Sequence, residues 1–375
     1  MKITKVEAHV VSVPMKIPYT TALAEKKTTE AVIVVVETDE GLRGLGQAAA
    51  SAPRYAPFDE FPAEVVLTVR ERLVPAVLGE DPRDLSTIHR KMGAAARGHV
   101  YAHTTIDVAI HDILGQSQGV PVWRLLGGRV RERIPLVAPH FGFMTPEELA
   151  RLATSYVGQG YRHINLRAGF GLETDKRMLG AVREAVGGGV GLDIDFSQSL
   201  TLHQGRPDAA IAYVRALEAF GLNSVEQPLA GGDLEGMARL AEAIDTPLIA
   251  DESVFSLDDL QRVIERRAAD IVKIKIVKTG GLWPARKWVA VGEAAGLSFT
   301  VGHGIAAGIQ NAAEAHLAFT IANLKVPGEM NGYLRVQDDV TAGDLTLDGT
   351  DLLPPTAPGL GATLDPEKLR RYALR

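Results

Sequence analysis

From residue 131 onward, short apolar runs alternate with longer stretches whose apolar residues recur at helical spacing. This alternation predicts repeated β-α units, and about eight of them favour a closed parallel barrel over an open sheet. Pro146, Pro207 and Pro284 stand near the expected helix starts, where a missing backbone N–H costs little. The expected strands are 134–138, 162–167, 190–195, 223–226, 247–250, 270–275, 298–302 and, more weakly, 326–330, and the expected helices are 146–159, 173–186, 207–220, 233–243, 257–266, 282–296 and 308–323.

The chain before residue 131 has a different pattern, in which strands come first and helices follow. Residues 1–13 and 31–37 are rich in β-branched side chains, and the second run leads through Asp39 and Gly41 into residues 42–48. Asp and Gly are turn residues, so this segment is predicted to be a hairpin. The helices expected after it are 63–74, 84–93 and 103–118.

The chain therefore divides into three expected parts: an α+β unit over residues 1–130, a barrel over 131–330, and a tail over 331–375. The tail is rich in Gly and Pro and is expected to pack back on the first unit. The glycine-rich stretch 41–46 lacks the spacing of a dinucleotide-binding fingerprint, and no helix is expected after it. We interpret its glycines as turn residues.

Composition narrows the function. The chain has 375 residues, 46% of them hydrophobic, and its net charge of −6 is too mild to indicate nucleic acid or a membrane surface as a partner. Cysteine is absent, which excludes disulfides, zinc–thiolate sites and thiol nucleophiles and fits a reducing cytosol. The N-terminus has no apolar signal segment, and no stretch approaches the roughly 20 apolar residues of a membrane helix. We expect a cytoplasmic protein that acts on a small molecule.

Three acidic residues, Asp195, Glu226 and Asp251, each close a short apolar run, and Lys275 ends the next such run. One strand-plus-helix unit of a barrel takes roughly 30 residues, and the carboxyl ends of its strands open onto one face. The intervals between these four positions are close to that length. Oxygen ligands of this kind suit Mg²⁺ or Mn²⁺ rather than zinc or copper. The spacing predicts a carboxylate metal site with a base beside it.

The third metal ligand is less obvious, because Asp251 and Glu252 are adjacent. Asp251 directly follows the expected strand and is chosen as the ligand, whereas Glu252 should point away and hydrogen-bond behind it. Lys273, Asp193 and His163 are expected to point inward one layer below, where buried charges need partners. We interpret these three as a structural polar layer.

Several motifs resemble those of the enolase superfamily, in particular its muconate-cycloisomerase branch. They are IDVAIHDILGQSQGVPVWRLLGG before the barrel, DIDFSQS around Asp195, VEQP around Glu226, ADES around Asp251 and KIKIVKTGG around Lys275. The resemblance covers essentially the whole chain. It implies a modified TIM-like (β/α)₇β barrel under an N-terminal capping domain, and a homo-oligomer. It also implies Mg²⁺ held by the three carboxylates, which stabilises an enolate made from a carboxylate substrate.

The resemblance implies catalytic bases on the second and sixth barrel strands. Lys275 matches the sixth-strand base, which must have a pKa well below about 10.4, and a neighbouring cation and burial would both lower it. On the second strand the usual Lys-x-Lys is replaced by Asn165 and Arg167. Arginine stays protonated, so Arg167 is expected to bind a carboxylate, stabilise the enolate, or pair with Asp195 or Glu226. Asn165 can hydrogen-bond to a substrate but cannot carry a proton to it.

A histidine, His303, follows the seventh expected strand in SFTVGHGIAAG. Some branches of the superfamily use a histidine near this position, paired with an acid where Lys275 stands here. His303 is therefore either structural or a group that protonates the enolate or a leaving group.

Two segments of the capping unit, 18–29 and 48–61, correspond to the loops that choose the substrate in the superfamily. Their candidate substrate contacts are Tyr19, Lys26, Arg54 and Tyr55. The two cations among them suit an anionic or hydroxylated acid.

With one base in place, we rank cycloisomerisation and β-elimination of water equally, and both above racemisation. Racemisation or epimerisation would need Arg167 or His303 on the opposite face. A non-catalytic relative that binds a metal and a carboxylate is the alternative from another class. A metal hydrolase is disfavoured because the chain has no His-x-His pair.

Overall fold

Six parallel strands form the centre of the computed structural model, which describes residues 1–22, 25–50, 60–204, 206–302, 308–325, 327–343 and 345–374. The strands pair in chain order, so each is followed by a helix that returns to the start of the next. They are β5 (His163–Arg167), β6 (Gly191–Asp195), β7 (Leu222–Glu226), β8 (Leu248–Ala250), β9 (Ile271–Ile274) and β10 (Ser298–Val301).

Isolated parallel bridges close this sheet into a barrel. The chain after β4 (Ile134–Pro135) joins β5 through the bridge between Ala138 and Ile164. The segment after α14 takes the eighth position: a bridge from Leu324 reaches β10, and one from Gly328 returns to the chain beside β4. The predicted barrel is thus confirmed, although its first and eighth positions are short bridged segments rather than full strands.

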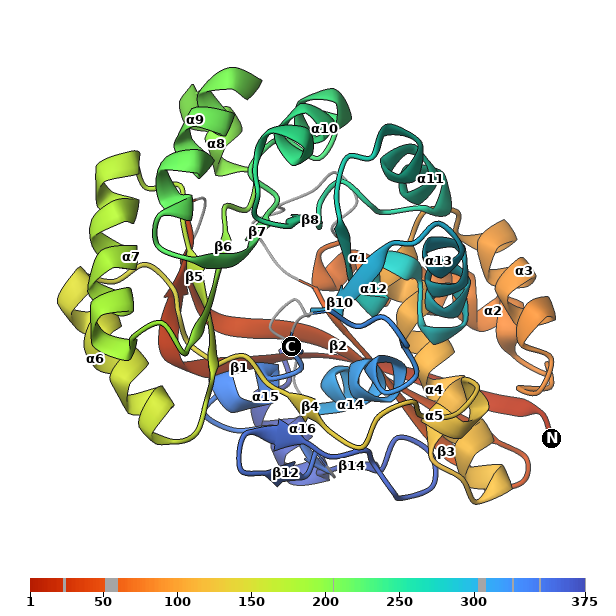
Figure 1. Cartoon of the computed structure of the whole chain (residues 1–375). Helices are drawn as coiled ribbons and strands as arrows, with labels where there is room; N and C mark the ends of the chain where they lie inside the picture. Colours follow the sequence, from red (N-terminus) through yellow and green to blue (C-terminus); the bar gives the residue numbers. More distant parts are fainter. Residues whose placement is uncertain are drawn as a thin grey trace.

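The helices follow one another around the strands, as Figure 1 shows. Local signals fix their starts: Thr145 forms a capping box with Glu148, and Ser256 accepts a hydrogen bond from the backbone N–H of Asp259. The outer helices are α6 (Pro146–Gly158), α7 (Leu172–Val186), α9 (Pro207–Glu218), α10 (Leu234–Ala243), α11 (Leu257–Arg266), α13 (Leu282–Ala294) and α14 (Gly308–Ala318), with short α8 (Ser199–Gln204) and α12 (Ile276–Thr279) at strand ends.

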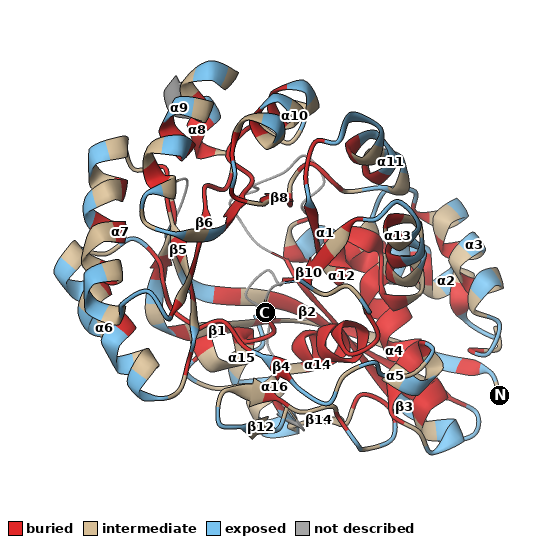
Figure 2. Cartoon of the chain, viewed as in Figure 1, coloured by how far each residue is buried: buried red, intermediate tan, exposed pale blue. Residues whose placement is uncertain are grey.

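The capping domain consists of a three-stranded antiparallel sheet and a layer of helices. Most residues of its longest helix, α4, are buried, because α4 packs between the sheet and the barrel helices α12 and α13 (Figure 2). Its elements are β1 (Ile3–Thr20), β2 (Glu25–Thr38), β3 (Arg43–Ala49), α1 (Pro62–Thr68), the π-helical turn η1 (Val69–Leu73), α2 (Val74–Val77), α3 (Leu85–Ala95), α4 (Val100–Gln118) and α5 (Val122–Leu125).

Two of the glycines interpreted as turn residues have another role. Gly41 lies in the turn with a positive φ of 79°, but Gly44 and Gly46 lie inside β3. A Cβ at Gly46 would stand 1.7 Å from the backbone oxygen of Thr105 on α4. The turn interpretation was therefore wrong for Gly44 and Gly46, which let strand and helix backbones approach closely.

The C-terminal segment lies along the capping sheet. Met15 and Val11 of β1 form antiparallel bridges with Val336 and Ala373. The elements of this segment are α15 (Gly332–Arg335), β11 (Thr341–Gly343), β12 (Leu347–Asp348), β13 (Asp351–Leu352), β14 (Ala362–Leu364) and α16 (Pro366–Tyr372). Across the described ranges, no helix has the length and apolar character needed to cross a membrane.

Candidate active site at the carboxyl ends of the strands

The three acidic residues singled out from the sequence lie at the carboxyl ends of adjacent strands. Asp195 and Glu226 end β6 and β7 and face each other in the strand register, and Asp251 directly follows β8. Their exposed fractions are 5%, 2% and 2%. Such burial is costly for a carboxylate unless a positive charge lies beside it.

Each of these carboxylates is paired with a cation of the chain. Arg167 pairs with Asp195, and Lys273 pairs with Glu226. Asp251 is paired with Lys275 at one oxygen and with a further lysine at the other. Among the described residues, no three acidic or histidine side chains converge as an assembled metal centre would.

The chemistry of these donors nevertheless fits Mg²⁺. All three are carboxylates, the ligands that a hard cation prefers. One oxygen of Asp195 is held in place, since it accepts hydrogen bonds from the backbone N–H of Ser197 at 2.6 Å and its hydroxyl at 3.0 Å. The other oxygen faces Arg167, a positive charge that a divalent cation would replace.

Asp251 is held from three sides. Lys278 Nζ donates to its backbone oxygen and to its Oδ1, both at 2.7 Å. The backbone N–H of Asp251 donates to Gln227 Oε1 at 2.9 Å, and the N–H of Ser253 donates to the same oxygen at 3.1 Å. Sequence reasoning did not single out Gln227, although it stands in the VEQP motif.

Lys275 follows β9 and contacts the remaining oxygen of Asp251. Burial by itself would lower the pKa of Lys275, but the negative charges of Asp251, Glu252 and Glu226 together raise that pKa above its ordinary value. The lowered pKa expected from burial and a neighbouring cation is therefore not found in this structure, where acids surround Lys275. The pKa of Lys275 is raised as long as Lys275 itself neutralises Asp251. Another positive charge on Asp251 would remove this cause of the rise.

Glu252 does not behave as expected. Its Oε2 is buried without a hydrogen-bond partner among the described residues, so the hydrogen bond predicted behind Asp251 is absent at that atom. Burial, reinforced by the charge of Asp251, raises the pKa of Glu252 to about 8. The chain turns immediately after β8, so the strand alternation on which the prediction rested does not extend to Glu252.

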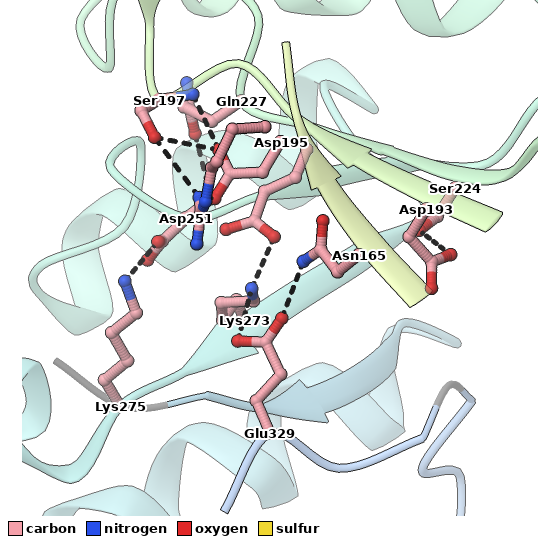
Figure 3. A network of polar contacts seen from close by, with 12 residues as sticks. Asn165, Asp193, Asp195, Ser197, Ser224, Gln227, Asp251, Lys273, Lys275 and Glu329 are labelled. Carbon is pink, nitrogen blue, oxygen red and sulfur yellow. Dashed lines mark hydrogen bonds and ion pairs between the residues drawn. The ribbon is translucent and has the colours of Figure 1, made fainter. Parts of the chain in front are cut away.

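Asn165 and Lys273 both bond to an acid that sequence reasoning missed, Glu329. Asn165 Nδ2 donates to Glu329 Oε1 at 2.7 Å, and Lys273 Nζ donates to Glu329 Oε2 at 3.0 Å (Figure 3). Lys273 also pairs with Glu226, so these contacts link β5, β7, β9 and the eighth segment. The available signal was the weak strand expected at 326–330.

The other members of the expected polar layer are paired below the site. Asp193 accepts hydrogen bonds from Ser224 Oγ at 2.6 Å and from His163 Nδ1 at 3.1 Å. These contacts satisfy the Asp193 carboxylate within the barrel wall, as a structural role requires.

The capping domain reaches the site through Tyr19. Arg167, besides its pair with Asp195, lies with its guanidinium carbon 5.1 Å from the centre of the Tyr19 ring. Lys26 is the cross-strand partner of Tyr19 in the β1–β2 pairing, so the two residues stand on the same face of that hairpin. Three further predicted residues, Arg54, Tyr55 and His303, lie outside the described residues.

Two family models match the chain. Residues 148–368 match the enolase C-terminal domain-like model, so the chain belongs to the enolase superfamily. Residues 5–127 match the model of the mandelate racemase / muconate lactonizing enzyme N-terminal domain. The chain is therefore a member of that branch, and it is an enolase-superfamily isomerase.

Similar proteins include racemases, epimerases and cycloisomerases. An N-succinyl-L-Arg/Lys racemase of Bacillus cereus is 30% identical over 100% of this chain and 98% of its own, and its crystal structure superposes with a TM-score of 0.94 at 28% identity, covering 100% and 99%. A chloromuconate cycloisomerase of Cupriavidus pinatubonensis is 29% identical over 97% and 96%. A dipeptide epimerase of Enterococcus faecalis, complexed with Mg and L-Leu-L-Tyr, has a TM-score of 0.89 at 28% identity, covering 97% and 100%. These relatives give no support to the predicted dehydration.

Proposed function

We propose that this protein is a Mg²⁺-dependent isomerase that moves the α-proton of a carboxylate substrate. In this proposal Asp195, Glu226 and Asp251 are the metal ligands and Lys275 is the base. The observation that carries it is the contact between Lys275 and Asp251 beside two other buried carboxylates at adjacent strand ends. The bound cation would neutralise the negative charge that develops on the substrate carboxylate.

The two lysines on Asp251 are suited to different tasks. The Lys275 side chain is 21% exposed, whereas that of Lys278 is 2% exposed. Lys275 is therefore the one that a substrate can reach. Lys278 keeps its two contacts with Asp251 while Lys275 turns to the substrate, so the carboxylate is not left without a positive neighbour.

The second strand supports chemistry on one face of the substrate. The amide of Asn165 is bonded to Glu329 and has no proton to transfer at ordinary pH. The guanidinium of Arg167 stays protonated, so it stabilises negative charge rather than accepting a proton. One base favours cycloisomerisation, in which a single group delivers and removes the proton.

Racemisation is the second candidate, favoured by the similarity to the N-succinyl-L-Arg/Lys racemase over the whole chain. It requires a proton carrier on the face opposite Lys275. Arg167 and His303 are the groups proposed for that position.

Deuterium exchange tests the proposal. The protein with Mg²⁺ in D₂O is given cis,cis-muconate, N-succinyl-L-arginine and a panel of acid sugars, and the products are followed by NMR and chiral chromatography. We expect deuterium at the α-carbon, and we expect Lys275→Met to reduce its rate by roughly 100-fold or more. Lys287→Met, which removes an exposed lysine on α13, is the matched control and should leave the rate unchanged.

The outcomes separate the candidates. Lactone formation, or exchange with retained configuration, supports the one-base reaction. Inversion at a rate comparable to exchange supports racemisation. Absence of exchange with every acid would favour a non-catalytic protein that binds a metal and a carboxylate.

A further inference from the structure

A buried arginine without an acidic partner lies next to the proposed site. Arg335, at the end of α15, is 7% exposed. Its Nε donates to Asn331 Oδ1 at 3.2 Å, and no acidic side chain within the described ranges forms an ion pair with it. The neighbouring cations at this end of the barrel do have carboxylate partners: Arg167, Lys273, Lys275 and Lys278. A buried, uncompensated guanidinium is costly.

Tyr19 joins Arg335 to the proposed active site. The ring of Tyr19 has the Arg167 guanidinium carbon 5.1 Å and the Arg335 guanidinium carbon 5.4 Å from its centre. The two guanidinium groups are therefore held against one aromatic ring. Because Arg167 pairs with Asp195, the Tyr19 ring and Arg167 connect Arg335 to one of the proposed metal ligands.

Two more buried polar groups near Arg335 have no partner among the described residues. The Tyr19 hydroxyl and His140 Nε2 are both buried and unbonded, in residues that are each 6% exposed. His140 Nδ1 is used by the Tyr156 hydroxyl at 2.6 Å, and His140 has a strained positive φ of 75°. Burial, with the charges of Arg335 and Lys16, lowers the pKa of His140 to about 4, although the nearby backbone of Arg335 acts in the opposite direction, so the His140 ring is neutral.

Arg335, the Tyr19 hydroxyl and His140 could all be satisfied by one kind of ligand group. Arg335 lacks a negative charge, and the Tyr19 hydroxyl lacks an acceptor. A neutral His140 can donate from Nε2 when Nδ1 accepts from Tyr156. A carboxylate supplies acceptors for all three, and guanidinium–carboxylate hydrogen bonds are among the strongest in proteins.

We infer that Arg335, with the Tyr19 hydroxyl and His140, binds a second anionic group of the substrate, a carboxylate remote from the reacting one. This inference rests on the proposed function and narrows it to acids that carry two negative charges. Arg335 is a specificity-determining residue here, because it contacts the far end of the substrate and leaves the reacting atoms to Lys275.

Two matched ligand pairs test this inference: N-succinyl-L-alanine against N-acetyl-L-alanine, and cis,cis-muconate against its monomethyl ester. Members of a pair differ in the remote carboxylate. Calorimetry with Mg²⁺ should show tighter binding of the dianion in at least one pair, by roughly 10- to 100-fold. In Arg335→Gln this preference should be lost, while binding of the monoanion stays unchanged.

A control variant at an exposed arginine and a second variant at Tyr19 complete the calorimetric test. Arg133→Gln removes an exposed arginine that pairs with Asp348 and Asp351, and it should keep the preference. Tyr19→Phe should reduce the preference several-fold, since only the hydroxyl is removed. If Arg335→Gln does not fold, Arg335→Lys replaces it, and an intermediate preference is expected.

Binding by the wild type that is equal or undetectable for both members of both pairs overturns the inference, as does an unchanged preference in Arg335→Gln. The proposed function fails differently. Calorimetry with Lys275→Met measures binding without turnover. If this variant prefers the dianion but the wild type shows no α-proton exchange with any acid, the proposed reaction is rejected and the proposed binding site is kept.

Discussion

Asn165 Nδ2 donates a 2.7 Å hydrogen bond to Glu329 Oε1, which joins the second strand of the barrel to its eighth segment. Glu329 also accepts from Lys273, and Lys273 pairs with Glu226. Asn165 is therefore linked through Glu329 and Lys273 to Glu226, a proposed metal ligand. The Asn165 amide is thus part of a polar network that crosses the barrel.

Replacing Asn165 with Asp should destabilise the protein, because a carboxylate would meet Glu329 where an amide donates now. A lost buried hydrogen bond with repulsion costs about 1–3 kcal/mol. Urea unfolding measures this loss of stability. Asn223→Asp is the matched control: Asn223 Oδ1 accepts from the backbone N–H of Leu192, and Asp preserves that bond. Equal stabilities of the two variants would contradict the network.

Removing a proposed ligand should weaken Mg²⁺ binding. We expect Asp195→Asn and Asp251→Asn to lower the affinity measured by calorimetry at least ~10-fold, the scale on which even outer-shell changes act. Asp193→Asn is the control, since its carboxylate is bonded to Ser224 and His163 one layer below. A weakened affinity in Asp193→Asn alone would place the metal elsewhere.

The two lysines on Asp251 should separate stability from activity. Lys278→Met removes a buried partner with two hydrogen bonds, and a hydrogen bond to a charged group is worth about 1.5–3 kcal/mol. Lys275→Met should cost less stability, because the Lys275 side chain is more exposed, yet it should slow proton exchange by roughly 100-fold or more. Urea unfolding measures the stability of both variants, and the exchange assay measures their activity. The reverse pattern would assign the base to Lys278.

The barrel was predictable because its strands and helices repeat with clear periods. The expected strands agree closely with the observed bounds of β5 to β10, and three acids at strand ends were found from spacing. Parallel strands bring their carboxyl ends together, so the position along the chain was enough.

The residues that were missed or wrongly interpreted from the sequence depend on tertiary contacts, which leave no local pattern in the sequence. Glu329 lies in a segment held by isolated bridges, so its strand pattern was weak. Gly46 is needed within β3 because Thr105, which is distant in the sequence, approaches its backbone. Arg335 stands in a tail without periodicity, and its relation to Tyr19 exists only after the tail lies along β1.

A buried acid on α14 gives the protein a pH-dependent stability. Glu314 accepts hydrogen bonds from Gln310 Nε2 at 2.7 Å and Asn311 Nδ2 at 2.9 Å. Burial raises the pKa of Glu314 to about 8, although both hydrogen bonds act in the opposite direction. Gln310 also accepts from the backbone N–H of Ala49 at the end of β3, so this acid lies under the junction of barrel and cap.

Between the ordinary pKa of 4.5 and about 8, the folded chain keeps a proton on Glu314 that the unfolded chain has released. The contribution of Glu314 to stability is therefore fully present below pH 4.5 and is lost as the pH rises to 8, with a slope of about 1.4 kcal/mol per pH unit. Glu314→Gln stays neutral, so the stability of the wild type relative to this variant should fall between pH 5 and pH 8 in urea unfolding. Glu184→Gln, at an exposed position of α7, should track the wild type throughout. Parallel pH profiles of wild type and Glu314→Gln would contradict the buried, protonated acid.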